Sequence, residues 1–195
     1  PLNPLRAVEY FSHFFEKPWK EMYDGQAISV PDMPRSYLPK YLGMKLPEIL
    51  LALGSLGVVG SVVASFNRSI PVRRRATILL IALAFIVPVA ITIAARPAMY
   101  NGIRHFLFIL PPLCILGGLA GSWVLRRLAE WSPAASVVGA AAIVIGLLLP
   151  LREMIELHPY QYAYFNRIAG GVKAADSRYM LDYWGLSFKQ AADEL

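Results

Sequence analysis

The sequence predicts an all-α membrane protein with four transmembrane helices, and three observations support this prediction. Of the 195 residues, 56% are hydrophobic and only 16% are charged, whereas soluble domains carry about 25% charged residues. Four apolar stretches are each close to the roughly 20 residues that a membrane-spanning helix needs. These stretches lack an alternation of period two, so the strands of a transmembrane barrel are not expected.

The predicted helices cover residues 46–66, 76–95, 106–125 and 134–151. Lipid leaves backbone polar groups without partners, so each stretch is expected to pair its own groups as a helix. Glu48 is the one formal charge within these bounds, and we interpret it as an acid in the first turn of its helix. Small residues recur along the stretches and predict a closely packed bundle; three of them are Gly54, Gly57 and Gly60.

Prolines and the polar flanks complete the predicted fold. Kinks or local unwinding are expected at Pro88 and at the pair Pro111–Pro112. Residues 1–45 are expected to combine an interfacial helix in "NPLRAVEYFSHFF" with an extended loop from Tyr23 to Tyr41. Residues 152–195 form a polar tail that is expected to end in a short helix beginning near Ser187. Because the chain starts with proline and shows no leader pattern, we expect it to be the C-terminal part of a longer chain.

Arginines in the short loops predict an orientation. The loops after the first and third spans hold six basic residues, namely Arg68, Arg73, Arg74, Arg75, Arg126 and Arg127. The loop between the second and third spans holds Arg96 and Arg104. Positive residues in short loops mark the cytoplasmic side. Both flanks and the Arg104 loop are therefore expected on the outer face, although Lys40, Lys45 and Arg152 in the flanks weaken the asymmetry.

Composition and motifs exclude several classes of function. A net charge of +6 on so apolar a chain indicates a membrane protein beside anionic lipid, and no basic stripe suited to nucleic acid is present. His13, His105 and His158 are scattered and Cys114 is the single cysteine, so no metal-ligand spacing occurs. No GxGxxG or Walker loop is present. Neither a metal nor a cofactor is expected.

Three polar and aromatic segments are expected to meet on the outer face: residues 23–41, 100–105 and 158–184. Arg104 could bind phosphate oxygens through two parallel hydrogen bonds, or it could extend to the membrane interface as an ordinary anchor. His158 and Tyr160 could form a platform for a sugar or lipid head group, or belong to an interfacial aromatic belt. The stretch Asp182–Tyr183–Trp184 places a carboxylate beside two rings, which suits a carbohydrate or a turn that docks the tail.

Four motifs taken in order resemble a known family. "PDMPRSYLPKYLGMKLPE", "YNGIRHFLFILPPL", "HPYQYAYFNRIAGG" and "LDYWGLSFKQAA" together resemble the C-terminal half of bacterial membrane glycosyltransferases of family 39. This family belongs to the GT-C superfamily and includes relatives of protein O-mannosyltransferases and of the lipid A aminoarabinose transferase. The resemblance extends from about Trp19 to the end of the chain.

The resemblance implies a multi-pass protein of the bacterial inner membrane that moves a hexosyl or pentosyl group from a polyprenyl-phosphate carrier to an acceptor at the periplasmic face. By this resemblance Arg104 contacts the lipid phosphate, with His105 second, and Tyr37 lines the same opening. The tail residues would close over the sugar or the acceptor; these are His158, Tyr160, Asp182, Tyr183 and Trp184. The family's catalytic acid lies in an earlier outer loop that no position here matches, so we expect it upstream and expect this part alone to be inactive.

Two other functions remain open at this stage. The chain could be part of a transporter or flippase, but transport normally needs ionisable groups within the spans, and these spans have almost none. It could also be a non-catalytic membrane scaffold, which would not need polar groups gathered on one face.

Overall fold

The computed structural model describes residues 3–12 and 19–194. Among them, four helices are long and apolar enough to cross a membrane, which confirms the all-α membrane fold. They are α3 (Glu48–Phe66), α4 (Val72–Ala95), α5 (Leu110–Trp131) and α6 (Pro133–Glu156). A 3-10 helix, η2 (Arg104–Ile109), leads directly into α5. The end of the predicted interfacial segment, from His13 onward, lies outside the described residues.

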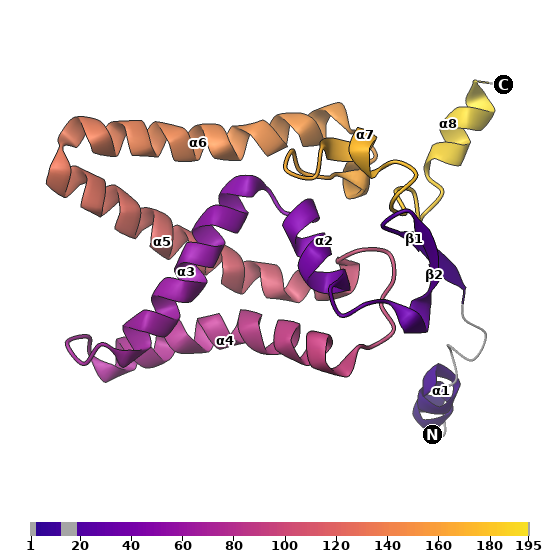
Figure 1. Ribbon diagram of the computed structural model, residues 1–195, viewed down its shortest axis with the longest axis horizontal. Coiled ribbons are helices and arrows are strands. Elements are labelled where there is room, and N and C mark those ends of the chain that lie inside the picture. The colour runs from indigo at the N-terminus through magenta and orange to yellow at the C-terminus, as the bar shows by residue number, and fades with distance from the viewer. Residues whose placement is uncertain (1–2, 13–18, 195) are drawn as a thin grey trace.

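Both polar flanks lie at the same end of the helices (Figure 1). We call this the flank end, and it carries residues 19–45 and 157–194. The opposite end, which we call the loop end, carries the α3–α4 connection and the tight turn at Ser132 (Figure 1). An even number of spans requires this arrangement, as the sequence predicted.

Two helices, α4 and α5, extend further at the loop end than the predicted apolar stretches. α4 begins at Val72, and the amide of Arg75 donates to the carbonyl of Pro71 over 3.1 Å. At the next turn, Ser132 caps α6 by accepting a hydrogen bond from the amide of Ala135 over 3.1 Å. Arginine is a good helix former, so the helical backbone continues past the point at which apolar composition stops.

The small residues of α3 allow a close crossing with α5. A Cβ atom added to Gly57 would lie 2.2 Å from the carbonyl oxygen of Leu116, so the two backbones meet there. One added to Gly117 would lie 3.4 Å from the amide nitrogen of Gly54. The predicted packing through small residues is therefore confirmed.

Two proline predictions have different outcomes. Pro111 and Pro112 do not kink a helix from within, because they stand in the first turn of α5, where the missing amide hydrogen removes no helical bond. The predicted unwinding lies just before them, where the chain is the 3-10 helix η2. At Pro88 the chain does not unwind, because α4 continues as a helix through this residue.

The flank end is built from short elements. The N-terminal part contains α1 (Asn3–Ser12), an antiparallel hairpin of β1 (Lys20–Tyr23) and β2 (Gln26–Ser29), the 3-10 helix η1 (Val30–Asp32) and α2 (Tyr37–Lys45). The tail adds η3 (Gln161–Ala163), α7 (Gly171–Ala175) and α8 (Ser187–Asp193). The helix predicted near Ser187 is confirmed.

The prediction of an extended loop from Tyr23 to Tyr41 was wrong for its last residues, which begin α2. Pro39 suggested a loop, but it occupies the first turn of this helix, where proline is tolerated. The hairpin turns at Asp24 and Gly25, which have φ of 53° and 80°. An Asp–Gly pair with positive φ at both residues is typical of a tight β-hairpin.

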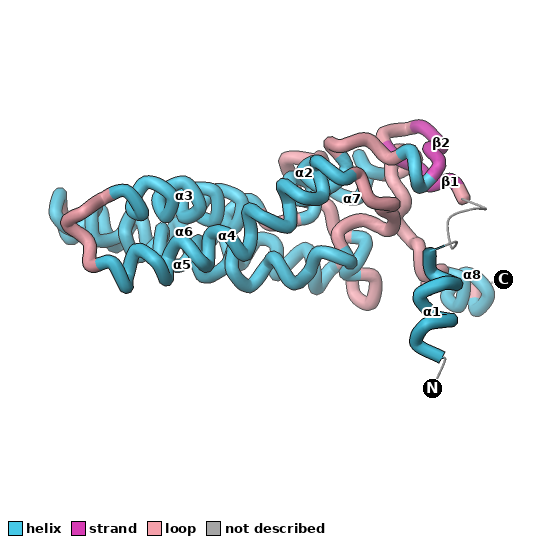
Figure 2. Tube along the Cα trace, turned by 90° about the horizontal axis from the view of Figure 1, so that it is seen from below, coloured by secondary structure: helices cyan, strands magenta, loops and turns pink. Residues whose placement is uncertain are grey.

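Figure 2 shows α2, α7 and the hairpin of β1 and β2 gathered at one end of the long helices. There an aromatic core joins the tail to α2 and the hairpin. The rings of Tyr23 and Tyr37 are stacked with centroids 5.3 Å apart, and Tyr41 lies 4.7 Å from Tyr37. From the tail, Phe165 and Tyr179 pack on Tyr41 at 6.4 and 5.7 Å. This core fixes where the tail lies relative to the start of α5.

Candidate functional site

The turn before η2 is held by two buried side chains. Asn101 and Gly102 both have positive φ, at 56° and 70°. The amide of Asn101 donates to Glu21 Oε2 over 2.7 Å, and the amide of Gly102 donates to the hydroxyl oxygen of Tyr37 over 2.9 Å. Tyr37 in turn donates to Glu21 Oε1 over 3.1 Å. These three hydrogen bonds fix the backbone from which Arg104 extends.

The guanidinium of Arg104 lies among aromatic rings. Its Cζ is 4.7 Å from the ring centroid of Tyr100, 5.2 Å from that of Trp184 and 5.9 Å from that of Tyr183. Contacts of this kind are attractive and restrict the orientation of the guanidinium. Two segments far apart in the chain therefore meet at this side chain, as the sequence predicted.

His105 sits beside Arg104 and makes the pair asymmetric in charge. Arg104 Nε donates to His105 Nε2 over 3.1 Å. A ring nitrogen that accepts a hydrogen bond carries no proton, so this geometry requires the neutral form of His105. Its ring also contacts Tyr100 edge-on, with centroids 4.8 Å apart. Arg104 therefore carries the positive charge of the site.

Glu21 lies beneath the turn and is 1% exposed. Burial raises the pKa of its carboxyl group, and the hydrogen bonds from Asn101 and Tyr37 and the charge of Arg104 oppose this effect only in part. Sequence reasoning missed Glu21. Its local sequence, "KEMY", contains no signal that separates a buried supporting acid from an exposed strand residue.

Asp182 is already occupied by its own segment. It accepts hydrogen bonds from the amides of Leu186 and Ser187 over 3.1 and 3.0 Å, and from the hydroxyl groups of Ser187 and Tyr162. Desolvation raises the pKa of its carboxyl group, but these bonds outweigh it and keep the pKa below its usual range. Asp182 therefore shapes the turn into α8, and this turn presents the next two residues to Arg104.

The rings that follow Asp182 differ in exposure. Tyr183 is half-buried and contacts Tyr162 at 5.2 Å between ring centroids. Trp184 is 61% exposed, with its ring beside that of Tyr183. The surface of the site at Arg104 is thus formed by one ring that is fixed in the tail and another that is open to a ligand.

Three other predicted residues do not contact Arg104. Tyr37 is 0% exposed, so it supports the turn and does not line an opening. His158 Nδ1 is hydrogen-bonded to Gln161 Nε2 over 2.9 Å, and the hydroxyl group of Tyr160 donates to Gln190 Oε1 in α8 over 2.9 Å. Within the described part of the chain, neither His158 nor Tyr160 has a ring or hydrogen-bond contact with Arg104.

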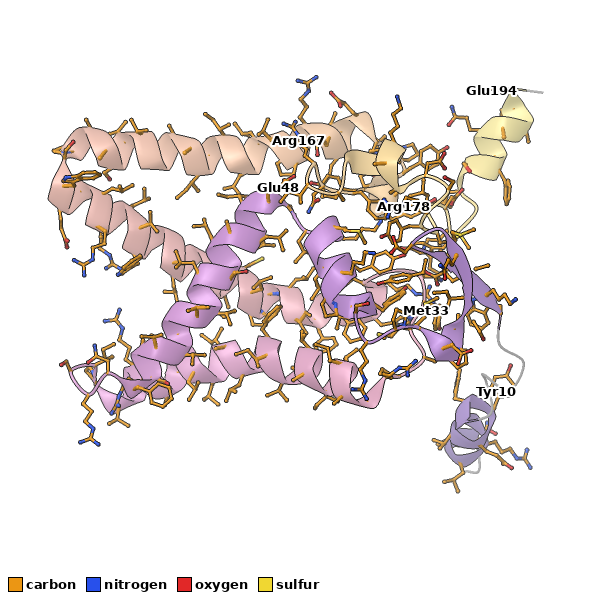
Figure 3. The ribbon with its side chains drawn as sticks, viewed as in Figure 1. Tyr10, Met33, Glu48, Arg167, Arg178 and Glu194 are labelled. Carbon is orange, nitrogen blue, oxygen red and sulfur yellow. The ribbon has the colours of Figure 1, made fainter. Side chains whose placement is uncertain are left out.

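A second polar cluster joins the tail to the ends of α3 and α6. The amide of Arg167 donates to Glu48 Oε1 over 2.7 Å, and its guanidinium pairs with Glu153. Figure 3 shows Arg167 and Glu48 close together where the tail folds back over the helices. Glu48 is the first residue of α3, as predicted. Because its carboxylate also accepts the hydrogen bond from the amide of Arg167, Glu48 holds the tail against the start of α3.

No cluster of three or more His, Cys, Asp or Glu side chains that could hold a metal occurs in residues 3–12 and 19–194. No protein-family model matches the chain, and no curated protein or solved structure shows significant similarity to it.

Proposed function

We propose that this chain is the C-terminal part of a membrane glycosyltransferase, and that Arg104 binds the phosphate of a lipid-linked sugar donor. The observation that carries the proposal is the setting of Arg104. Its guanidinium contacts three aromatic rings at the start of a membrane-spanning helix. Within the described residues it makes no ion pair with a carboxylate, so its charge is available to an anion from outside.

This setting suits a phosphate group. A guanidinium offers five N–H donors in one plane, and one of them is used by His105. The remaining donors can form the paired, charge-assisted hydrogen bonds that arginine makes to phosphate. The side chain also lies at the end of a membrane helix, where the head group of a lipid donor would be.

The neighbouring rings suit the sugar. The exposed face of Trp184 and the adjacent Tyr183 can stack on the C–H face of a sugar ring, while the phosphate remains beside Arg104. Asp182 acts indirectly by holding the turn that carries both rings.

The apolar chain of the donor has a candidate location. A groove of about 550 Å³ lies between α3, α5 and α6. Its lining includes Cys114 and Gly118, in the early turns of the helix that follows Arg104. Because this lining is almost wholly apolar, it suits a polyprenyl chain better than a polar solute.

Transfer by the full-length protein tests the proposal. The protein would be incubated with a panel of polyprenyl-phosphate sugars, and products would be identified by mass spectrometry. Loss of a charge-assisted contact worth about 1.5–3 kcal/mol predicts that Arg104→Ala lowers kcat/KM by roughly 10- to 150-fold. Arg152→Ala is the control, because Arg152 is an exposed arginine at the same end that pairs with Glu156. Normal transfer by Arg104→Ala at a normal protein level would refute the proposal.

A further inference from the structure

A second groove lies at the loop end, away from Arg104. It is formed between α3, α4 and α5 and has a volume of about 370 Å³. Small residues of α3 line one part of it, among them Gly57, Gly60, Ser61 and Ala64. Trp123 of α5, which is 50% exposed, lines another part. The groove is therefore apolar along most of its length.

Two arginines make its composition unusual. Arg74, in the first turn of α4, and Arg126, in the last turns of α5, both line the groove. Arg126 Nε donates to the carbonyl of Ser122 over 3.2 Å, which leaves its other donors available. Within the described residues neither arginine forms an ion pair. Two exposed cations thus border an apolar groove and lack a protein anion.

The surrounding charge strengthens this imbalance. The loop end carries six arginines: Arg68 lies between α3 and α4, Arg73–Arg75 lie in the first turn of α4, and Arg126 and Arg127 lie in the last turns of α5. The acid there is Glu130. Glu130 pairs with Arg127 over 2.9 Å, so it does not neutralise the groove. A negatively charged group is therefore attracted to the groove entrance.

We propose that this groove binds an anionic glycerophospholipid of the surrounding bilayer. Its phosphate would lie between Arg74 and Arg126, and an acyl chain would lie along the glycine-containing face of α3. A free inorganic anion would not bind the apolar lining, and an uncharged chain would not pair with the two arginines. An amphiphile with a phosphate at one end uses both features, and Trp123 is of the type that occupies the membrane interface. This inference is independent of the proposed transferase activity.

Lipid retention by the purified full-length protein tests the charge requirement. Native mass spectrometry would follow binding of phosphatidylglycerol, with zwitterionic phosphatidylcholine as the comparison lipid. Arg74→Gln and Arg126→Gln should each weaken retention of phosphatidylglycerol by about fivefold, the effect of about one interfacial charge. Arg68→Gln and Arg73→Gln each remove one exposed positive charge from the same end of the helices but do not line the groove. An equal effect of all four substitutions would refute a localised site.

A steric variant tests the groove without changing its charge. No atom lies within 4 Å of a Cβ added at Gly60, so Gly60→Leu can be accommodated and would occupy the space of the acyl chain. It should reduce retention of phosphatidylglycerol at least as much as one arginine substitution. Gly118→Leu is the matched control, because Gly118 is equally open but lines the other groove.

Two results would overturn the assignment. One is equal retention of phosphatidylglycerol by Gly60→Leu and Gly118→Leu. The other is displacement of the lipid by millimolar inorganic phosphate, which would identify a site for a free anion. The arginine variants change exposed side chains, so they keep the test valid if Gly60→Leu fails to fold.

Discussion

Tyr37→Phe removes a single hydroxyl group and tests whether a buried hydrogen-bond network holds the Arg104 turn. The ring and its stacking on Tyr23 are preserved. Two partners are lost: Glu21 Oε1, which accepts the hydroxyl hydrogen, and the amide of Gly102, which donates to the hydroxyl oxygen. Because Tyr37 is fully buried and Gly102 is buried, water does not readily replace the lost hydroxyl group.

The expected loss follows from these two bonds. A hydrogen bond contributes about 0.5–1.5 kcal/mol, and a buried amide left without an acceptor costs about 1–3 kcal/mol. We therefore expect Tyr37→Phe to lower the free energy of unfolding by about 3 kcal/mol. Because Gly102 lies two residues before Arg104, we also expect transfer activity to fall, although Tyr37 does not line the surface of the site.

Tyr179→Phe is the matched control for this prediction. It makes the same chemical change in the same aromatic core, but its hydroxyl donates to Asp24 over 3.2 Å. Asp24 is 41% exposed and is already paired with Lys40 and Arg178, so we expect a loss below about 1 kcal/mol. Urea unfolding in mild detergent, followed by near-UV circular dichroism, would measure both values. Equal losses for the two variants would refute the role assigned to the Tyr37 hydroxyl.

Three further predictions test the packing that positions the site. Gly57→Ala should destabilise the α3–α5 crossing by about 3 kcal/mol because the new methyl group meets the backbone of Leu116, whereas Gly60→Ala should not destabilise it. Equal unfolding midpoints for the two variants would contradict this prediction. Asn166→Asp should cost about 3 kcal/mol or more in the same urea assay, since Asn166 Nδ2 donates to the carbonyls of Gly43 and Leu46 over 2.7 and 2.8 Å; a loss below 1 kcal/mol would argue against this tie. Burial lowers the pKa of Lys45 to about 7 in the folded protein, below its ordinary value of 10.5. Between these pH values the unfolded chain binds more protons than the folded protein, so stability should rise with pH across that window. Lys45→Met should abolish that rise, and an unchanged pH profile would contradict the assignment.

Local composition was sufficient to predict the membrane helices. Apolarity over a stretch of residues determines whether a segment partitions into lipid, and lipid then requires a helix. Gly57 and its neighbours likewise indicated close packing, which the contact with Leu116 confirms. The beginning of α2 was missed because Pro39 is compatible with both a loop and a first helical turn.

The sequence by itself determined four membrane-spanning helices, two polar flanks at one end, and an arginine at the start of the third span. Only the tertiary structure decided which residues surround that arginine. Glu21 and Tyr37 hold its turn from 80 and 65 residues away in sequence, and of the tail residues it is Tyr183 and Trp184 that reach it. The physical reason is that helix formation depends on neighbouring residues. These contacts instead depend on how the tail packs against α2 and the hairpin through the buried aromatic core.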